Sequence, residues 1–332
     1  MLKIYDNTII YVLCPSYKKS GGPELAHQLV YEINQMGGRA EIAYYDLNNE
    51  KLRINEAFKC YVSSFVDMNQ IVDDSSNVVV SPEAHPELLD KFKKIQKAVW
   101  WMSVDNYLKE HDPLASLKIF GCESGRRILR ALKFSISSKK YFKNVTHFYQ
   151  SFYAKKFLES KGVFDSIRLS DYLNASYLDL DIETERENQV LYNPLKGVRF
   201  TKMLMDYAPN IKWIPLQNMS TEQVKTTLLH SKVYVDFGNH PGKDRFPREA
   251  AMCGCCVITG KRGSAKYFED VPINDEFKFD ENNQSIQLIL CKLRDCLENY
   301  ETYKLKFDKY RDLIRDEYRI FQEDVKKVFI AG

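Results

Sequence analysis

Apolar and polar positions follow two different periods along this chain. Residues 8–14 form a short apolar run, residues 24–36 place leucine and isoleucine at helical spacing, and residues 39–45 form a second apolar run. The short runs predict buried strands, and the spaced pattern predicts a helix that covers them. Further strands are predicted at 77–80, 98–102, 146–149 and 166–169, with helices near 87–95 and at 151–160. This order predicts an α/β fold built on a parallel sheet.

An acidic and polar stretch at 179–188 interrupts the pattern, and we interpret it as a linker. The alternation then begins again. Strands are predicted at 190–193, 211–215, 232–237 and 255–259, with helices at 198–207 and 220–229, and helix formers fill residues 285–330. Ser220 and Gln223 have the spacing of a capping box at the start of the second helix. The predicted organisation is two Rossmann-like domains, 1–182 and 183–300, and a C-terminal helical segment, 301–332.

Composition shows that the chain is long enough for two cores. It has 332 residues, of which 44% are hydrophobic and 28% are charged, as is ordinary for a soluble globular protein. No run of about 18 apolar residues occurs, so a membrane-spanning helix is not expected. Residues 1–14 predict a first strand and not a signal peptide. We therefore expect a cytoplasmic location.

Eight cysteines are scattered through the chain, which favours reduced thiols over disulfides in that location. Cys253, Cys255 and Cys256 lie close together, but they lack a second pair of cysteine or histidine ligands at metal-binding spacing. They are typical of small buried residues in a turn between a helix and a strand. No metal site is predicted.

The net charge disfavours nucleic acid as a partner, but the local charge of residues 115–145 is strongly positive. The net charge of +3 is too small to indicate nucleic acid as a partner. Residues 115–145, however, carry eight basic side chains and one acidic side chain, with apolar residues interleaved. Such a basic amphipathic stretch can lie peripherally on an anionic membrane or hold a polyanionic acceptor. A solvated connecting helix is the alternative.

The segment after the predicted strand 232–237 carries the most specific chemistry. A loop leads from this strand into a short helix, and it contains His240, Gly242, Lys243 and Arg245. Backbone N–H groups and the helix dipole at such a loop favour an anion, so phosphate is the first ligand to consider. The G-x-G-x-x-G and G-x-x-x-x-G-K-[ST] motifs are both absent, which disfavours doubly wound dehydrogenases and P-loop enzymes.

This segment resembles the signature of retaining, nucleotide-sugar-dependent glycosyltransferases of the GT-B architecture, family 4 in particular. The family pattern is Pro-x-x-Glu-Ala-x-x-x-Gly-x-x-Val. Here the residues from Pro247 to Val257 read PREAAMCGCCV, with the Pro one place closer to the Glu. The resemblance implies that Glu249 binds the ribose of the donor nucleotide. Where the family usually carries a second Glu, eight places earlier, this chain has Pro241.

Two other loops are similar to the same family. Gly21 and Gly22, before the first predicted helix, resemble the acceptor-domain loop that faces the donor diphosphate. In the second domain, Lys196 and the glycine after it match the Lys-Gly pair that holds the diphosphate in the family. Asn193 stands where the family has an Arg. Arg199, or the cations of the later loop, can supply the missing charge.

The later loops carry several candidate site residues, and for most of them a structural role is the alternative. The resemblance places Lys243 and Arg245 where the leaving diphosphate would be stabilised. Asp244 either replaces the absent Glu near the sugar or pairs with Arg245. His240 either donates to a phosphate or sugar oxygen or is structural. Gly263 and Ser264 lie in a loop that resembles the glycine-containing loop at the donor phosphates, and here too a structural role is the alternative.

The first domain offers one candidate for the acceptor. Asp105 follows the predicted strand 98–102 at the edge where ligands bind in open α/β sheets. It can orient or deprotonate the acceptor hydroxyl, and a role as N-cap of the next helix is the alternative. Asp105 and Asp244 are thus the two catalytic candidates.

Together, the resemblance and the residues predict a GT-B glycosyltransferase with two Rossmann-like domains facing a cleft and C-terminal helices crossing back. The expected partners are a nucleotide-diphosphate sugar as donor and a glycan or lipid-linked acceptor, with no metal and no further cofactor. The family implies bacterial surface polysaccharide or glycolipid synthesis. Two alternatives stay open. One is a nucleotide-sugar epimerase of the same architecture, and the other is a non-catalytic nucleotide-binding partner of another transferase, which the missing Glu and Arg favour.

Overall fold

The computed structural model describes residues 2–45, 52–114 and 141–330. Contacts divide the chain into two compact units. Unit 1 comprises Met1–Asp171 and Arg319–Gly332, and unit 2 comprises Tyr172–Tyr318. The divisions lie at 171/172 and 318/319, whereas the sequence analysis placed them at 182/183 and 300/301. Most of the basic stretch 115–145 lies outside the described residues, which resume at 141.

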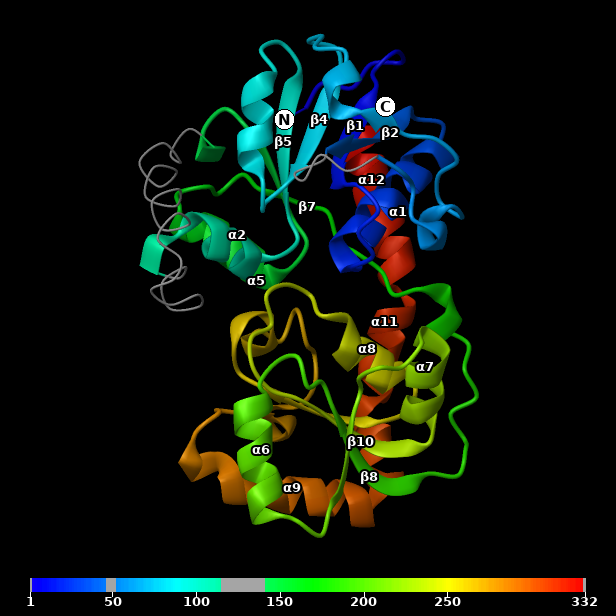
Figure 1. The fold of residues 1–332 in the computed structure, drawn as a ribbon, viewed down its shortest axis with the longest axis vertical. Helices are drawn as coiled ribbons and strands as arrows, with labels where there is room; N and C mark the ends of the chain where they lie inside the picture. Colours follow the sequence, from blue (N-terminus) through cyan, green and yellow to red (C-terminus); the bar gives the residue numbers. More distant parts are fainter. Residues whose placement is uncertain (1, 46–51, 115–140, 331–332) are drawn as a thin grey trace. The chain divides into compact units, whose positions relative to one another are not determined.

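Unit 1 is built on a parallel sheet of seven strands in the order β3-β2-β1-β4-β5-β6-β7 (Figure 1). The strands are β1 (Ile10–Pro15), β2 (Ala40–Tyr45), β3 (Val66–Asp67), β4 (Val78–Pro82), β5 (Gln96–Trp101), β6 (Thr146–Tyr149) and β7 (Ile167–Arg168). The helices are α1 (Gly21–Gln35), α2 (Val104–His111), α5 (Phe152–Ser160) and the part of α12 (Glu317–Phe329) from Arg319 onward. Residues of the central strands are buried, because helices cover them.

The end of the chain is fixed to the sheet of unit 1 by a buried carboxylate. Asp324 of α12 accepts hydrogen bonds from Arg168 Nε at 2.9 Å and from the backbone N–H of Ser170 at 3.0 Å. Phe329 of the same helix packs edge-on against Phe148, a β6 residue. The C-terminal helix therefore belongs to unit 1 although it begins in unit 2, as the predicted crossing back requires.

One predicted helix of unit 1 is different in the structure. The segment near 87–95 forms only a short 3₁₀ helix, η3 (Pro86–Lys91). The residues after it form a bend and not a helix, because the Asp73 carboxylate accepts hydrogen bonds from the backbone N–H groups of Lys93, Lys94 and Ile95, at 2.8–2.9 Å. A side chain distant in sequence thus competes with the helical pattern for these donors.

Unit 2 contains a parallel sheet of five strands in the order β12-β11-β10-β8-β9. The strands are β8 (Glu187–Tyr192), β9 (Lys212–Pro215), β10 (Ser231–Asp236), β11 (Cys256–Gly260) and β12 (Lys278–Phe279). The helices are α6 (Val198–Tyr207), α7 (Thr221–Leu229), α8 (Arg245–Met252), α9 (Ile286–Glu298), α10 (Tyr300–Lys304) and α11 (Asp308–Arg315). The predicted capping box of Ser220 and Gln223 is present at the start of α7.

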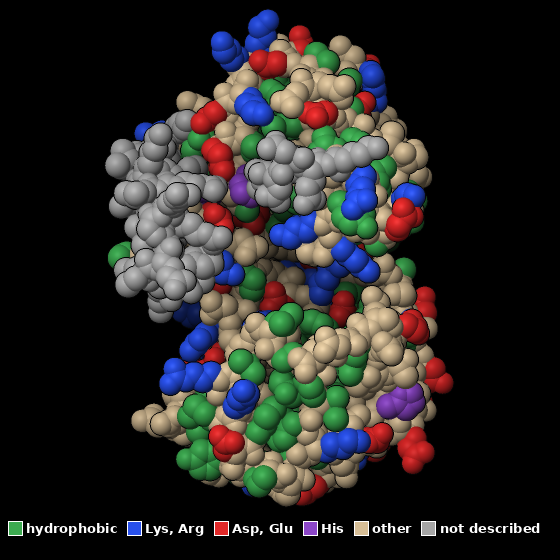
Figure 2. All heavy atoms as spheres, viewed as in Figure 1, with side chains coloured by type: hydrophobic (Ala, Val, Ile, Leu, Met, Phe, Trp, Pro, Cys, Tyr) green, Lys and Arg blue, Asp and Glu red, His purple; other side chains and the backbone are tan. Residues whose placement is uncertain are grey.

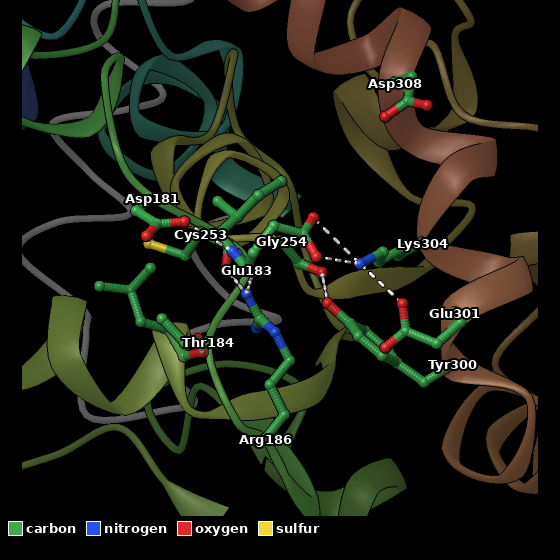
Figure 3. A network of polar contacts seen from close by, with 12 residues as sticks. Asp181, Glu183, Thr184, Arg186, Cys253, Gly254, Tyr300, Glu301, Lys304 and Asp308 are labelled. Atoms are coloured by element: carbon green, nitrogen blue, oxygen red, sulfur yellow. Dashed lines mark hydrogen bonds and ion pairs between the residues drawn. The ribbon is translucent and has the colours of Figure 1, made fainter.

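The guanidinium of Arg186 donates hydrogen bonds to several backbone carbonyl groups of unit 2, and Figure 3 shows its surroundings. Its guanidinium donates to the carbonyl oxygens of Ser231 at 2.7 Å, Ile182 at 3.0 Å and Cys253 at 2.6 Å. A fourth hydrogen bond, to Leu228 at 3.3 Å, engages the C-terminal end of α7. Carbonyl groups at helix ends lack partners within the helix, so one cation here satisfies the ends of both α7 and α8.

The surface and the cysteines agree with an ordinary globular protein. Figure 2 shows Lys and Arg interspersed with Asp and Glu on the face in view, on both units. No helix within the described ranges combines the length and the apolar character that crossing a membrane would require. Cys253, Cys255 and Cys256 are buried free thiols in the core of unit 2.

Gly254 is the position that Arg186 makes sensitive to substitution. Its φ is 88°, and a Cβ there would lie 2.4 Å from Arg186 Nη2. Gly37 has a φ of 84° with nothing within 4 Å of such a Cβ, so it is the matched control. Gly37→Ala should cost about 1–2 kcal/mol of unfolding free energy from backbone strain alone. Gly254→Ala should cost about 1–3 kcal/mol more because the guanidinium must move. Equal losses in urea unfolding would contradict this account.

Candidate functional site

Two loops leave the same edge of the unit 2 sheet and touch through their backbones. One joins β8 to α6, the other joins β10 to α8, and β8 and β10 are parallel neighbours. Gly197, at a φ of 62°, lies so close that a Cβ would be 2.1 Å from the Phe237 carbonyl oxygen. A Cβ on Gly238, at a φ of 97°, would be 2.5 Å from the nitrogen of Gly197. Glycine is required at both positions because no side chain fits there.

The Lys196 cluster, formed by Lys196, Asp236, His240 and Asp244, joins these two loops. Lys196 Nζ lies 2.9 Å from Asp236 Oδ1 and also donates to Asp244 Oδ2. His240 Nδ1 lies 3.1 Å from that same Asp244 oxygen, and its Nε2 is 3.1 Å from the Asp236 carbonyl oxygen. Asp236 and His240 are buried, whereas the Lys196 and Asp244 side chains are 19% and 20% exposed. The cluster is therefore a largely buried ion network, and only Lys196 and Asp244 are partly exposed to solvent.

Each ion in this network favours the charged form of the other. Burial acts to raise the pKa of Asp244, but the hydrogen bond from His240 and the charge of Lys196 outweigh it, so the pKa is lowered. Burial acts to lower the pKa of Lys196, but Asp236 and Asp244 outweigh it and the pKa is raised. The two shifts agree in direction. Lys196 is therefore an ammonium group, and Asp244 is a carboxylate.

The cluster also has the donor types of a cation site. Asp236, His240 and Asp244 each offer an atom, and these atoms lie within 4.8 Å of one another. Carboxylate and imidazole groups can bind divalent cations. The ammonium of Lys196 already contacts both carboxylates, however, and so supplies the positive charge that a metal ion would bring.

Arg248, on α8, holds the loop between β10 and α8 through hydrogen bonds to its carbonyl groups. Its side chain is fully buried. It donates to the carbonyl oxygens of Asp244 at 3.2 Å and Lys243 at 3.1 Å, and to Glu317 Oε2 at 2.7 Å. Lys243 Nζ lies 2.7 Å from the other oxygen of Glu317. Lys243, predicted to face the diphosphate, is thus held by Glu317, a residue that the sequence analysis did not single out.

Gly263 and Ser264 contact this loop as well. The Ser264 N–H donates to the His240 carbonyl oxygen at 2.9 Å, and its hydroxyl donates to the Gly242 carbonyl oxygen at 2.5 Å. A Cβ on Gly263, whose φ is 56°, would be 2.0 Å from the His240 oxygen. The structure therefore brings four of the predicted site residues together, and these contacts stabilise the conformation of the loop.

The remaining predicted residues of unit 2 lie on the same two loops or on α8. Arg245 is the first residue of α8, and Glu249 lies one turn further along, partly exposed. Asn193 accepts a hydrogen bond from the Leu195 N–H at 2.9 Å, which shapes the turn after β8. Glu281 was missed: its carboxylate accepts from the Gly238 N–H at 2.8 Å. The only sequence signal for Glu281 is its position just after a two-residue strand, which is too short to predict.

Unit 1 carries the other predicted residues at the carboxyl edge of its own sheet. Gly21 and Gly22 are the first residues of α1, after β1. Asp105 lies in the first turn of α2, where Tyr153 OH donates to it at 3.0 Å. The alternative role of Asp105 as the N-cap is wrong, because Ser103 is the N-cap and accepts the Asn106 N–H at 3.2 Å.

Comparison with known proteins relates this architecture to solved structures. No model of a known family matches the sequence, and no curated protein matches it. Sucrose-phosphate synthase from Thermosynechococcus elongatus superposes with a TM-score of 0.67 at 10% identity, over 97% of this chain and 98% of that one. HepE of Anabaena, in complex with UDP-glucose, superposes with a TM-score of 0.62 at 10% identity, over 97% of this chain and 99% of that one. TarM superposes with a TM-score of 0.58 at 9% identity, over 95% of this chain and 99% of that one.

These similarities define the fold. This chain has the GT-B fold, an α/β architecture with two parallel sheets and helices that correspond to the solved structures over nearly the whole chain. The predicted fold class is confirmed. The solved structures named above are glycosyltransferases, and at 9–10% identity they establish architecture and not activity.

The Lys196 cluster predicts a specific loss of stability at low pH. Asp244→Asn should lower the unfolding free energy by about 3 kcal/mol at pH 7, because it breaks a buried ion pair. The folded pKa of Asp244 is below its unfolded value, so the stabilisation is complete above about pH 4 and is lost as pH falls through the folded pKa. Urea titrations should show a large difference in unfolding free energy between the variant and the wild type at pH 7 and a smaller one at pH 3, where the unfolded carboxyl group is mostly protonated.

The control for this experiment is an exposed ion pair of unit 2. Asp312 pairs with Arg315 at 2.8 Å, and its side chain is 73% exposed. Asp312→Asn should change stability by less than about 1 kcal/mol at either pH, since solvent screens such pairs. An Asp244→Asn effect that does not decrease at all between pH 7 and pH 3 would show that the ion pair is not its cause.

Proposed function

We propose that this protein is a glycosyltransferase that moves a sugar from a nucleoside diphosphate sugar to an acceptor hydroxyl. The observation that carries the proposal is the close contact of two loops, through Gly197 and Gly238, at the carboxyl edge of the unit 2 sheet. The second of these loops leads into α8, which carries Glu249 on its second turn. Ligands bind at this edge in open α/β sheets. The fold supports the same assignment, since HepE, which shares it, was solved with UDP-glucose.

The finer assignment rests on the sequence resemblance to family 4. We propose retention of configuration, a hexosyl donor, and a glycan or lipid-linked acceptor in bacterial surface polysaccharide or glycolipid synthesis. We also propose a cytoplasmic protein, with peripheral contact to an anionic membrane through 115–145, a stretch that lies mostly outside the described residues. No metal and no cofactor other than the donor are required in this proposal.

In this proposal, the cation that binds the diphosphate differs from those that the sequence indicated. Lys196 and Lys243 are both engaged by carboxylates of the protein, so neither is a free cation. Arg199 is exposed, lies in the first turn of α6, and has no acidic partner within the described chain. The N-terminus of α6 adds partial positive charge at the same place. Arg199 therefore takes the role of the family arginine that Asn193 replaces.

The donor site can be tested through the ribose contact. Glu249→Ala should weaken UDP binding by about 1.5–3 kcal/mol, because the ribose hydroxyls lose a charged acceptor. Glu298→Ala, at the exposed end of α9, is the matched control and should leave the affinity unchanged. Isothermal titration calorimetry measures both. If the two variants bind UDP equally well, Glu249 is not a donor ligand.

The cation assignment is tested by comparing ligands with and without phosphate. Arg199→Ala should weaken UDP binding by about tenfold and leave uridine binding unchanged, since only the charged hydrogen bond to phosphate is lost. Lys196→Ala should change the affinities for UDP and for uridine equally, because Asp236 and Asp244 already neutralise this lysine. Thermal unfolding of the same variants separates this effect from loss of the cluster. Equal losses of affinity for both ligands in Arg199→Ala would remove Arg199 from the phosphate site, and a larger loss for UDP in Lys196→Ala would return Lys196 to it.

Product analysis separates the proposed reaction from the alternatives. A transferase releases UDP and forms a new glycoside when it receives a donor and an acceptor. An epimerase converts the donor into an isomer without releasing UDP. A non-catalytic partner, which Pro241 and Asn193 favour, binds UDP with no conversion of any donor. NMR spectroscopy of the product distinguishes the three outcomes, and the anomeric configuration tests retention.

A further inference from the structure

An arginine and a tyrosine stack on each other at the carboxyl edge of the unit 1 sheet. Tyr17 lies in the loop of residues 16–20, which joins β1 to α1 (Figure 1). The guanidinium carbon of Arg53 is 3.6 Å from the centre of the Tyr17 ring. Arg53 is exposed, and Tyr17 is 43% exposed. Attraction between the cation and the ring therefore holds the guanidinium in one plane at the surface of the protein.

The side-chain donors of Arg53 are not used by the described part of the chain. There, its guanidinium has no carboxylate partner and donates no hydrogen bond, and only its backbone is bonded, to the Ser16 hydroxyl at 2.9 and 3.3 Å. Arg186, by contrast, lies 5.3 Å from the Tyr300 ring and donates to four backbone carbonyl groups. A planar guanidinium with unengaged N–H donors is suited to bind a phosphate or a carboxylate.

The backbone of Tyr17 adopts a conformation that its side chain disfavours. Its φ is 57°, in the left-handed region. Among the described residues, the other non-glycine residues with positive φ are Asn144 and Asn218, and asparagine tolerates this region better than tyrosine does. Asn55 maintains the conformation, because its Nδ2 donates to the Tyr17 carbonyl oxygen at 2.8 Å. Backbone strain of this kind is concentrated at ligand-binding sites.

The two segments that form the stack carry only positive charge. Residues 15–22 and 52–55 contain Lys18, Lys19 and Arg53, and no Asp or Glu. Both lysines are exposed, and neither forms an ion pair with another described residue. Glu56, which begins η1 (Glu56–Phe58), is paired with Lys59 at 2.8 Å. Three neighbouring cations without partners of opposite charge attract an anion.

The strand order places this loop where the direction of the sheet changes. β1 lies between β2 and β4, so the chain adds strands first on one side of β1 and then on the other. In open α/β sheets, ligands bind outside the carboxyl ends of the strands at such a point. The stacked pair therefore lies at the position in unit 1 where a ligand is expected.

We propose that Arg53, held by its stack on Tyr17, binds a phosphate group of the acceptor. This inference rests on the proposed function. The guanidinium donates two parallel hydrogen bonds to the phosphate, and the ammonium groups of Lys18 and Lys19 add attraction over a longer range. Three cations suit the double charge of a phosphate monoester better than the single charge of a carboxylate. A sugar phosphate and a lipid-linked sugar pyrophosphate both present such a group.

Calorimetry with the full-length protein tests the site. The protein is first saturated with the nucleoside diphosphate that raises its thermal unfolding midpoint most, so that the donor site is occupied. Hexose 1-phosphates, hexose 6-phosphates and glycerol 3-phosphate are then titrated, each beside its unphosphorylated parent. Arg53→Ala should weaken binding of the tightest phosphorylated ligand by about tenfold and leave that of its parent unchanged, because only the charged hydrogen bonds to phosphate are lost.

The matched control is an exposed arginine at the opposite edge of the same sheet. Arg39 directly precedes β2, and Arg39→Ala should leave the affinity unchanged. Tyr17→Phe keeps the ring and should bind as the wild type does, whereas Tyr17→Ala should lose part of the affinity because the guanidinium is no longer held. Arg53→Lys keeps the charge without the paired donors, so it should recover only part of the affinity lost in Arg53→Ala.

Two further probes identify the carrier of the phosphate. One is a lipid-linked sugar pyrophosphate in detergent micelles, and the other is vesicles of phosphatidylglycerol. Binding that depends on Arg53 supports the proposal with the soluble sugar phosphates and with the lipid-linked sugar, and it assigns the acceptor to one of these two classes. If the Arg53→Ala substitution affects vesicle binding alone, the stacked pair contacts membrane lipid and the proposal is overturned.

Failure of this inference is distinguishable from failure of the proposed function. Equal affinities of the wild type and Arg53→Ala for every phosphorylated ligand, or no binding of any of them, would overturn this inference alone. A protein that binds a sugar phosphate through Arg53 but transfers no sugar from any donor would overturn the proposed function, and the phosphate site would lose its role in acceptor binding.

Discussion

One ammonium group, that of the mostly buried Lys196, organises the edge of the unit 2 sheet. Lys196 is contributed by the loop after β8, and both carboxylates that it contacts belong to β10 or to the loop that follows it. Without the cation, two negative charges would lie close together in a poorly solvated place, which is strongly unfavourable. Without the carboxylates, the cation would be unpaired. The three groups therefore hold the two loops at a fixed separation, and the glycine contacts between the loops depend on that separation.

This arrangement explains why the family resemblance is partial at these loops. The Lys-Gly pair keeps its position, but the lysine is neutralised by Asp236 and Asp244 instead of remaining available to a phosphate. The chain retains a cation at the beginning of α6 in Arg199, where it has no acidic partner within the described residues.

Much of the fold was predictable from the sequence, because strand and helix periods are local signals. Ten of the twelve strands of the described chain, the capping box of α7 and the α/β class follow from such signals, whereas the two-residue strands β3 and β12 were not predicted and the GT-B architecture was implied by the family resemblance. The failures involve contacts between distant residues. The Asp73 carboxylate prevents a helix over Lys93–Ile95, and neither its sequence position nor its neighbours indicate this. Glu281 and Glu317 escaped prediction for the same reason, since their partners lie on other loops.

The Arg186 guanidinium has a consequence for local motion. It binds carbonyl groups at the C-terminal ends of α7 and α8 together with that of Ser231 on β10. Helix ends normally fray one at a time, with little free-energy cost. Here, opening either end removes a hydrogen bond from the same cation, so the amide groups behind both ends should exchange with deuterium as one cooperative block. The C-terminal end of α8 then opens only together with that of α7.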